Sequence, residues 1–232
     1  MLIINADDWG RSEEITGRIL ECHLRGRIHS ASAMTFMRDS ERAASIALQQ
    51  RLPTGLHLNL SQEFTGENVP ETLRAQHGRI AGYLNRRKYN QVLYNPLVRN
   101  ALLYAFRAQW DEYTRLYGEQ PGRLDGHHHM HLCLNALVSL KLPRGMRIRR
   151  NFSFSRGEKG PVNRLYRYLV DRRLRSRYSC TDYFFSLEPI RAERLERIRA
   201  IARCSDVELM VHPGVGEEYE FLLGPEWERM IP

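Results

Sequence analysis

The sequence is poor in lysine and cysteine, and it has no long apolar run. Nearly all of its 35 basic residues are arginine, and its four cysteines are scattered without a Cys-x-x-Cys pair. Scattered cysteines argue against a disulfide framework or a zinc ribbon and are typical of free thiols in a reducing compartment. No apolar run approaches the roughly 20 residues that span a bilayer, and the first residues lack a signal-peptide pattern. We therefore expect a cytoplasmic protein without a transmembrane segment.

The length and composition are those of one folded domain. The chain has 232 residues, 42% of them hydrophobic, and a mean hydropathy of −0.51. A chain of this length can bury a full core, and we expect a single domain across residues 1–232.

The net charge of +8 raises the question of an anionic partner. The most basic stretch, RLYRYLVDRRLRSRY (residues 164–178), is compatible with an arginine-rich helix face in water and with contact to an anionic surface. No nucleic-acid-binding signature is present, so we expect no nucleic-acid partner.

Apolar runs of strand length alternate with amphipathic runs of helical length. Strands are predicted at residues 2–5, 30–36, 54–60, 122–126, 145–152, 180–187 and 206–214. Helices are predicted at residues 12–26, 39–50, 96–118, 133–140, 161–177 and 190–203. Residues 61–95 contain scattered glycine, proline and asparagine and are predicted to form a long irregular excursion. This alternation predicts a parallel sheet with right-handed crossovers.

Unusual polar residues fall within or just after the predicted strands. They are Asn5, Asp7, Asp8, His57, Asn59, Asp125, the histidines of 127–131, and His212. Because the carboxyl ends of parallel strands gather functional side chains, we expect these residues to meet at one rim. His57 taken alone, between two leucines, is equally typical of a buried, hydrogen-bonded histidine.

The segment RLDGHHHMHL (residues 123–132) is the densest of these groups. It lies in the middle of the chain and is interrupted by Met130, so it is not an expression tag. An aspartate and two imidazoles would form a mixed oxygen and nitrogen site for a divalent cation, with positions open for water or substrate. Of two adjacent aspartates, one could bind the cation while the other acts as a general base.

Four segments carry a resemblance to a known family. They are NADDWG (5–10), GLHLNL (55–60), LDGHHHMH (124–131) and ELMVHPG (208–214). In this order they resemble the signature blocks of the YdjC-like carbohydrate deacetylase family, which includes chitooligosaccharide deacetylases and hopanoid-biosynthesis-associated proteins. The blocks extend over nearly the whole chain and are jointly highly specific.

The resemblance implies a deformed (β/α) TIM-like barrel and a metal-dependent hydrolase. The enzyme would remove an acetyl group from an N-acetylated sugar of an oligosaccharide or a glycolipid. One divalent cation, Mg²⁺ or Zn²⁺, would be held by Asp8, His57 and His127. Asp7 would be the general base toward water, and His212 would protonate the departing amine. Amide hydrolysis needs an activated water, a stabilised oxyanion and a protonated leaving nitrogen, which agrees with these roles.

The histidine cluster is compatible with two conformations. In an extended chain, His129 and His131 share the side of His127 and lie near the substrate or behind the ligands, and His128 points away. In a helix, His127 and His131 form an i, i+4 pair that also chelates metal. We favour His127 over His131 as the third ligand.

Three further residues are candidates around the ligands. Asp125 is expected to orient one of the imidazoles through its second ring nitrogen. Asn59, in the third predicted strand, and Arg149, at a strand end, are expected near the substrate or behind the ligands.

The chain differs from the family pattern in three places. Trp9 replaces the common phenylalanine after the paired aspartates, and DGHHH replaces a serine-containing form. Neither change removes a ligand. The chain stops at GPEWERMIP, where family members usually continue through a helix and a final strand. We therefore expect either a barrel that is open at its C-terminal end or a sequence that has been shortened there.

Two other functions compete with deacetylation. The same ligands fit another metal-dependent hydrolase, such as a phosphoesterase whose phosphate is held by arginines of residues 147–177, although such sites often use two metals. A basic module for nucleic acid or an anionic surface predicts steeply salt-dependent binding that survives loss of His57 and His127. A homodimer is compatible with the sequence.

Overall fold

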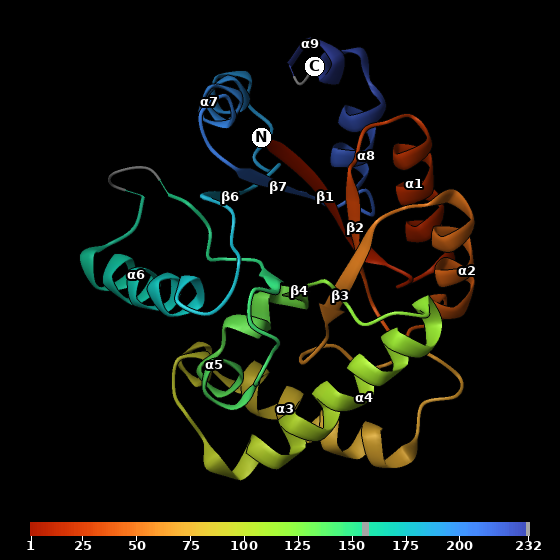
Figure 1. Cartoon of the computed structure of the whole chain (residues 1–232), viewed down its shortest axis with the longest axis vertical. Coiled ribbons are helices and arrows are strands. Elements are labelled where there is room, and N and C mark those ends of the chain that lie inside the picture. The colour runs from red at the N-terminus through yellow and green to blue at the C-terminus, as the bar shows by residue number, and fades with distance from the viewer. Residues whose placement is uncertain (155–157, 231–232) are drawn as a thin grey trace.

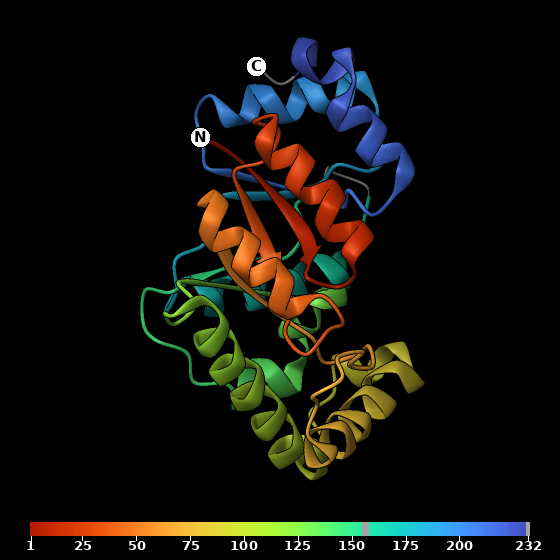
Figure 2. The same cartoon turned by 90° about the vertical axis from the view of Figure 1, so that its right-hand side faces the viewer.

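The computed structural model describes residues 1–154 and 158–230. The strands are β1 (Leu2–Trp9), β2 (Ser30–Ala33), β3 (Thr54–Leu58), β4 (Arg123–Gly126), β5 (Arg147–Ile148), β6 (Tyr183–Ser186) and β7 (Val207–Val211). The helices are α1 (Glu13–Leu24), α2 (Ser40–Gln50), α3 (Glu71–Arg86), α4 (Arg99–Tyr117), α5 (Leu134–Ser139), α6 (Pro161–Arg175), α7 (Ala192–Ala202), α8 (Gly216–Leu223) and α9 (Pro225–Met230). Figure 1 shows the strands at the centre with helices around them, and Figure 2 shows α1 and α2 covering one side.

The strands form one curled sheet in the order β5-β4-β3-β2-β1-β7-β6, and their pairings are parallel. The predicted α/β class and TIM-like barrel are therefore confirmed. Strand β1 is central, because it pairs with β2 on one side and with β7 on the other. The first and last strands of the chain are thus neighbours, and their carboxyl ends lie at the same rim.

The strand ladder is open between β5 and β6, the two edge strands. A few backbone hydrogen bonds span this opening: Ile148 N–H donates to the carbonyl of Ser179 (2.9 Å), and Ser153 N–H donates to that of Phe184 (2.8 Å). The opening therefore lies in the second half of the chain, whereas the last strand, β7, is fully paired with β1 and β6. The strands predicted at 145–152 and 180–187 are correspondingly short, since their ladder is interrupted here.

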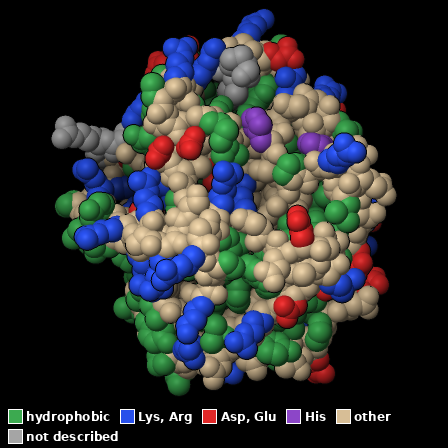
Figure 3. Space-filling view, viewed as in Figure 1, with side chains coloured by type: hydrophobic (Ala, Val, Ile, Leu, Met, Phe, Trp, Pro, Cys, Tyr) green, Lys and Arg blue, Asp and Glu red, His purple; other side chains and the backbone are tan. Residues whose placement is uncertain are grey.

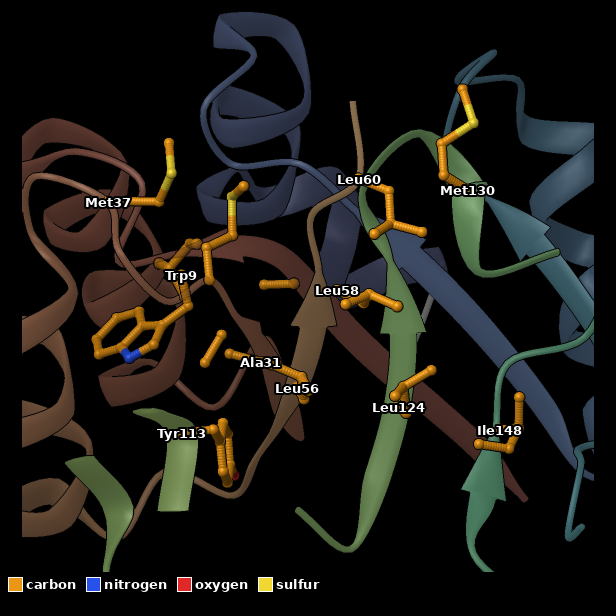
Figure 4. Close-up of a cluster of buried hydrophobic side chains, with 14 of the residues drawn as sticks. Trp9, Ala31, Met37, Leu56, Leu58, Leu60, Tyr113, Leu124, Met130 and Ile148 are labelled. Atoms are coloured by element: carbon orange, nitrogen blue, oxygen red, sulfur yellow. The ribbon is translucent and has the colours of Figure 1, made fainter. Parts of the chain in front are cut away.

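Alternation along the strands separates an apolar exterior from a polar interior. Successive side chains of a strand point to opposite faces. Leu56 and Leu58 of β3 and Leu124 of β4 are buried in the core that the sheet shares with its helices (Figure 4). His57 and Asp125, which are register partners in β3 and β4, therefore point into the barrel.

The prediction of an irregular excursion across residues 61–95 is wrong for residues 71–86, which form α3. Leu73, His77, Ile80 and Leu84 are its buried residues, at the three- and four-residue spacing of one helix face. Two exposed glycines and a polar outer face obscured this period in the sequence. Helices α8 and α9, which follow the last strand, were also not predicted.

Apart from the buried Arg123 and Arg149, the described lysines and arginines are at least partly exposed. Figure 3 shows lysine and arginine side chains spread across the face seen in Figure 1.

Among residues 1–154 and 158–230, none of the helices combines the length and hydrophobicity that crossing a bilayer requires.

Two glycine substitutions test the packing of the barrel. A Cβ at Gly55 of β3 would lie 2.9 Å from the backbone oxygen of Arg123, which cannot move without disturbing β4. We expect Gly55→Ala to lower the free energy of unfolding by about 1–3 kcal/mol. A Cβ at Gly78 of α3 meets nothing within 4 Å. Gly78→Ala should raise that free energy by about 1 kcal/mol, because alanine favours a helix.

Denaturant unfolding followed by circular dichroism measures both effects. A neutral or destabilising Gly78→Ala would contradict the helix at residues 71–86, and a harmless Gly55→Ala would contradict the close β3–β4 approach.

Candidate metal centre

The paired aspartates lie near the end of β1, where the backbone of the strand is irregular. The register of β1 against β2 shifts between Ala6 and Trp9, and Asp8 has a positive φ of 72°. Residues other than glycine seldom adopt this conformation, and aspartate is one of the few that tolerate it. Such strained residues cluster at functional sites, where their surroundings hold them in place. The irregularity gives Asp7 and Asp8 different surroundings although they are adjacent.

Asp8 faces two imidazoles from separate strand ends. Its Oδ1 lies 3.4 Å from Nε2 of His57 and 2.9 Å from Nδ1 of His127. The side chains of all three residues are buried, and one ligand atom from each lies within 4.8 Å of the others. The structure therefore brings together the three residues predicted to bind metal.

The oxygen of Asp8 at the centre of this group is unsatisfied. Asp8 Oδ1 is buried and has no hydrogen-bond partner in the described part of the chain. The same is true of Nε2 of His127, the ring nitrogen that does not face Asp8. Buried polar atoms normally have partners, and an unpaired carboxylate oxygen beside two ring nitrogens fits a cation. One carboxylate and two imidazoles are a donor set suited to a divalent metal.

Asp125 fixes the orientation of His57. Its Oδ1 lies 2.6 Å from Nδ1 of His57, so the Nε2 of that ring is directed toward Asp8. Ser32 Oγ donates to the other oxygen of Asp125 over 2.6 Å. A carboxylate behind a histidine in this way selects the ring tautomer and strengthens it as a ligand. Burial opposes protonation of His57, but Asp7, Asp125 and Asp8 outweigh burial and raise its pKa to about 10. The same carboxylates would attract a metal cation.

Asp7 is bound from behind by Arg149. The guanidinium donates to both oxygens of Asp7, over 2.6 and 2.7 Å, and Asn5 Nδ2 donates to Oδ1 over 2.9 Å. Burial raises the pKa of Asp7, but the charges of Arg149 and His57 outweigh it and lower the pKa to about 2. Asp7 is therefore an ionised carboxylate with a fixed direction. Arg149 itself is completely buried behind Asp7, so its position is that of a support and not of a substrate contact.

His212 approaches from the end of β7. Its Nε2 lies 4.0 Å from Oδ2 of Asp7, and about a third of the side chain is exposed. Glu218, in the first turn of α8, accepts a hydrogen bond from the His212 backbone N–H (2.6 Å), and its other oxygen lies 3.8 Å from Nδ1 of His212. Burial lowers the pKa of His212, but the hydrogen bond with Glu218 and the charges of Asp7, Glu218 and Asp8 outweigh it and raise the pKa.

Two further histidines of the cluster, His128 and His129, line the cavity beside these groups. The cavity has a volume of about 450 Å³ and includes Asp7, Asp8, Arg11, His57, His127, His128, His129 and His212 in its walls. His128 and His129 have positive φ angles of 52° and 57°, so the chain is neither extended nor regularly helical here. Neither of the two predicted conformations is therefore present, so the direction expected of His128 in an extended chain does not apply. Its Nδ1 instead lies 3.0 Å from Ser61 Oγ at the cavity wall.

His131 and Asn59 interact with backbone groups and lie outside the cavity wall. Nε2 of His131 lies 3.0 Å from the carbonyl oxygen of Arg149, and this ring is buried away from Asp8. The Asn59 carboxamide bonds to the backbone of Ser61 and Gln62 and so shapes the loop after β3. Neither residue is among the described residues of the cavity wall.

Three charged residues that support the site, Arg123, Glu208 and Glu218, were not among the residues predicted from the sequence. Arg123 donates to Asp125 and Glu208, each over 2.7 Å, and Arg149 also donates to Glu208 over 2.7 Å. Glu208 did carry a signal in the sequence, because it is a charged residue inside the otherwise apolar strand VELMV of β7. Glu218 gave no such signal, because it follows the last strand in a helix that was not predicted.

The fold and the site together define a TIM-like α/β barrel with a candidate metal centre at one rim. A family model described as YdjC-like protein matches residues 1–231. The chain belongs to this YdjC-like family, as the four sequence blocks predict.

Several relatives have names that state an activity. A chitooligosaccharide deacetylase of Proteus mirabilis (strain HI4320) is 29% identical over 133 residues, which cover 57% of this chain and 50% of the relative. A carbohydrate deacetylase of Danio rerio is 28% identical over 138 residues, covering 56% and 42%, and one of Mus musculus is 30% identical over 136 residues, covering 56% and 43%. The chain thus matches about half the length of these curated relatives.

A solved structure shares the fold. It is a crystal structure of a protein from Enterococcus faecalis V583 that is named for cellobiose-phosphate cleavage. The TM-score is 0.67 with 20% identity, and the alignment covers 99% of this chain and 93% of the other. The two proteins therefore share this fold over nearly the whole length of both chains.

Removing single imidazoles tests which of them bind the cation. We expect His127→Ala to weaken Zn²⁺ binding by more than the roughly 10- to 100-fold that loss of a supporting residue causes. His131→Ala is the matched control and should bind Zn²⁺ within about tenfold of the wild type, since its ring bonds to a backbone carbonyl. Isothermal titration calorimetry gives both affinities, with circular dichroism to verify folding. Binding that depends on His131 and not on His127 would overturn this ligand set.

Proposed function

We propose that this chain is a metal-dependent carbohydrate N-deacetylase with one catalytic domain. The main support is geometric: Asp8, His57 and His127 converge on one point, with Asp7 and His212 beside them at one cavity. The names of the chitooligosaccharide and carbohydrate deacetylases among the relatives point to the same chemistry. The substrate class is therefore an N-acetylated sugar of an oligosaccharide or a glycolipid.

Asp8, His57 and His127 would hold one divalent cation. Two imidazoles favour Zn²⁺ over Mg²⁺, because Mg²⁺ prefers oxygen ligands. When bound, the cation would supply Lewis acidity to the acetamide carbonyl and to a water molecule. Asp125 holds the His57 ring in the orientation that this role needs.

Asp7 and His212 would move the protons. Asp7 accepts a proton from the attacking water, and Arg149 keeps this carboxylate ionised and aimed. The water oxygen bonds to the acetyl carbon, and the bond from that carbon to the sugar nitrogen breaks. His212, with its pKa raised by Glu218 and the aspartates, donates a proton to the departing nitrogen. The products are acetate and an amino sugar.

Replacing the proposed base provides the first test. We expect wild-type protein with Zn²⁺ to release acetate from N-acetylated chitooligosaccharides, and Asp7→Asn to slow this release roughly 100- to 10,000-fold. Acetate is measured by an enzyme-coupled assay. Asp206→Asn, an exposed carboxylate before β7, is the matched control and should retain activity.

A phosphate ester assayed in parallel separates the proposal from its competitor. Phosphate release without acetate release would reassign the site to a phosphoesterase. Full activity in Asp7→Asn would exclude Asp7 as the base.

Glu218 provides a test through pH. His212 must be protonated to act as an acid, so activity should fall as pH rises through its raised pKa. Glu218→Gln removes the main interaction that raises this pKa, and the alkaline limb of the kcat profile should move to lower pH. An alkaline limb unchanged by Glu218→Gln, in a folded variant, would contradict the assignment of His212 as the acid.

A further inference from the structure

Helix α6 is attached to the barrel by one face only. Its buried residues are Val170, Asp171 and Leu174. The carboxylate of Asp171 faces the segment that follows β5. Asp171 accepts from Arg150 Nη2 over 2.5 Å and from the backbone N–H of Asn151 over 3.1 Å. These contacts fix the rotation of the helix about its axis, and with it the residues that face outward.

The outward face of α6 carries an exposed aliphatic stripe. Val162, Leu165 and Leu169 have exposed fractions of 81, 59 and 53%. Their spacing of three and four residues places them on one side of the helix. Tyr168 is exposed beside them. Single exposed apolar residues are ordinary, whereas a stripe on one helix face marks a surface that contacts an apolar partner.

The stripe is bordered by cations. Arg164 and Arg172 are exposed, and neither has a carboxylate partner among residues 1–154 and 158–230. Arg173 and Arg175 are also exposed and lie on the same helix. The helix has a single acid, Asp171, which is buried. The outward face is therefore aliphatic and cationic, and Figure 3 shows hydrophobic and basic side chains intermixed on the left, over α6.

We propose that the outward face of α6 docks this protein on an anionic lipid bilayer. A basic helix with an aliphatic stripe lies flat in the interface, with its apolar side chains among the acyl chains and its arginines at the headgroups. An exposed tyrosine beside the stripe suits the same depth. Nucleic acid would satisfy the arginines but leave the aliphatic stripe in water, so the bilayer fits both halves of the pattern.

The docking face adjoins the candidate metal centre. Phe152 lines a groove of about 480 Å³ together with Arg164 and Tyr168 of α6. The ring of Phe152 also lies 4.6 Å from that of His129 in the cavity wall. A bilayer beneath α6 would therefore lie on the same side of the molecule as this approach to the site. The docking itself does not depend on the proposed hydrolysis.

Vesicle co-sedimentation tests the docking. Vesicles of phosphatidylcholine with one-third phosphatidylglycerol should retain the wild-type protein, and vesicles of phosphatidylcholine alone should retain far less. We expect Arg164→Gln and Arg172→Gln each to weaken partitioning about fivefold. Leu165→Glu and Leu169→Glu should each weaken it about tenfold or more, because the aliphatic contact is lost. The matched controls are Arg107→Gln on α4 and Leu48→Glu on α2, both exposed, and they should bind as the wild type does.

Three outcomes would overturn the proposal. The first is equal partitioning of the wild type onto neutral and anionic vesicles, and the second is anionic binding that the α6 variants retain. The third is a different partner: RNA binding that survives Leu165→Glu, or a dimer in light scattering that Leu165→Glu dissociates. Acetate release from a water-soluble substrate should be unchanged in Leu165→Glu and Leu169→Glu, so a failure of docking and a failure of the deacetylase proposal are distinguishable.

Discussion

Two buried arginines hold together the carboxylates on which the candidate site depends. Arg149 contacts Asp7, Asp125 and Glu208, and Arg123 links Asp125 to Glu208. These side chains come from strands β1, β4 and β7 and from the end of β5, so one charge network joins both halves of the sheet. Breaking one partner of a buried pair costs about 3–5 kcal/mol. The interior of this barrel thus takes its shape from ion pairs where other barrels use branched apolar side chains.

The network also explains why Asp7 and Asp8 have different surroundings although they are adjacent in the sequence. Arg149 occupies both oxygens of Asp7 and holds it as a fixed anion. Asp8, turned by its positive φ, directs an unsatisfied oxygen toward His57 and His127 instead. Three carboxylates, those of Asp7, Asp125 and Glu208, thus face two buried guanidinium groups. Asp8 lies outside this network and pairs instead with Arg11 at the rim.

The positions of the strand ends could be predicted from the sequence, whereas the directions of side chains and the packing of helices could not. The convergence of Asp8, His57 and His127 followed from the parallel sheet, because carboxyl ends share a rim. Arg149 was expected near the substrate or behind the ligands, and its buried side chain binds Asp7 inside the barrel. The sequence left these two positions open, because a shift of one residue in a strand reverses the face. Helix α3 was missed because its buried residues are separated by polar residues and glycines. The irregular turn at His128 and His129 depends on tertiary packing that no local pattern encodes.

The central position of β1 has a consequence for how the protein is made. Asp8, His57 and His127 belong to the first part of the chain, and His212 emerges from a ribosome long after them. In a nascent polypeptide, these three side chains are therefore present before β7 arrives to pair with β1. Until β7 inserts, the Arg149 and Asp7 pair lacks its Glu208 neighbour, and His212 is absent from the cavity. The proposed proton transfers would thus become possible only after β7 has paired with β1.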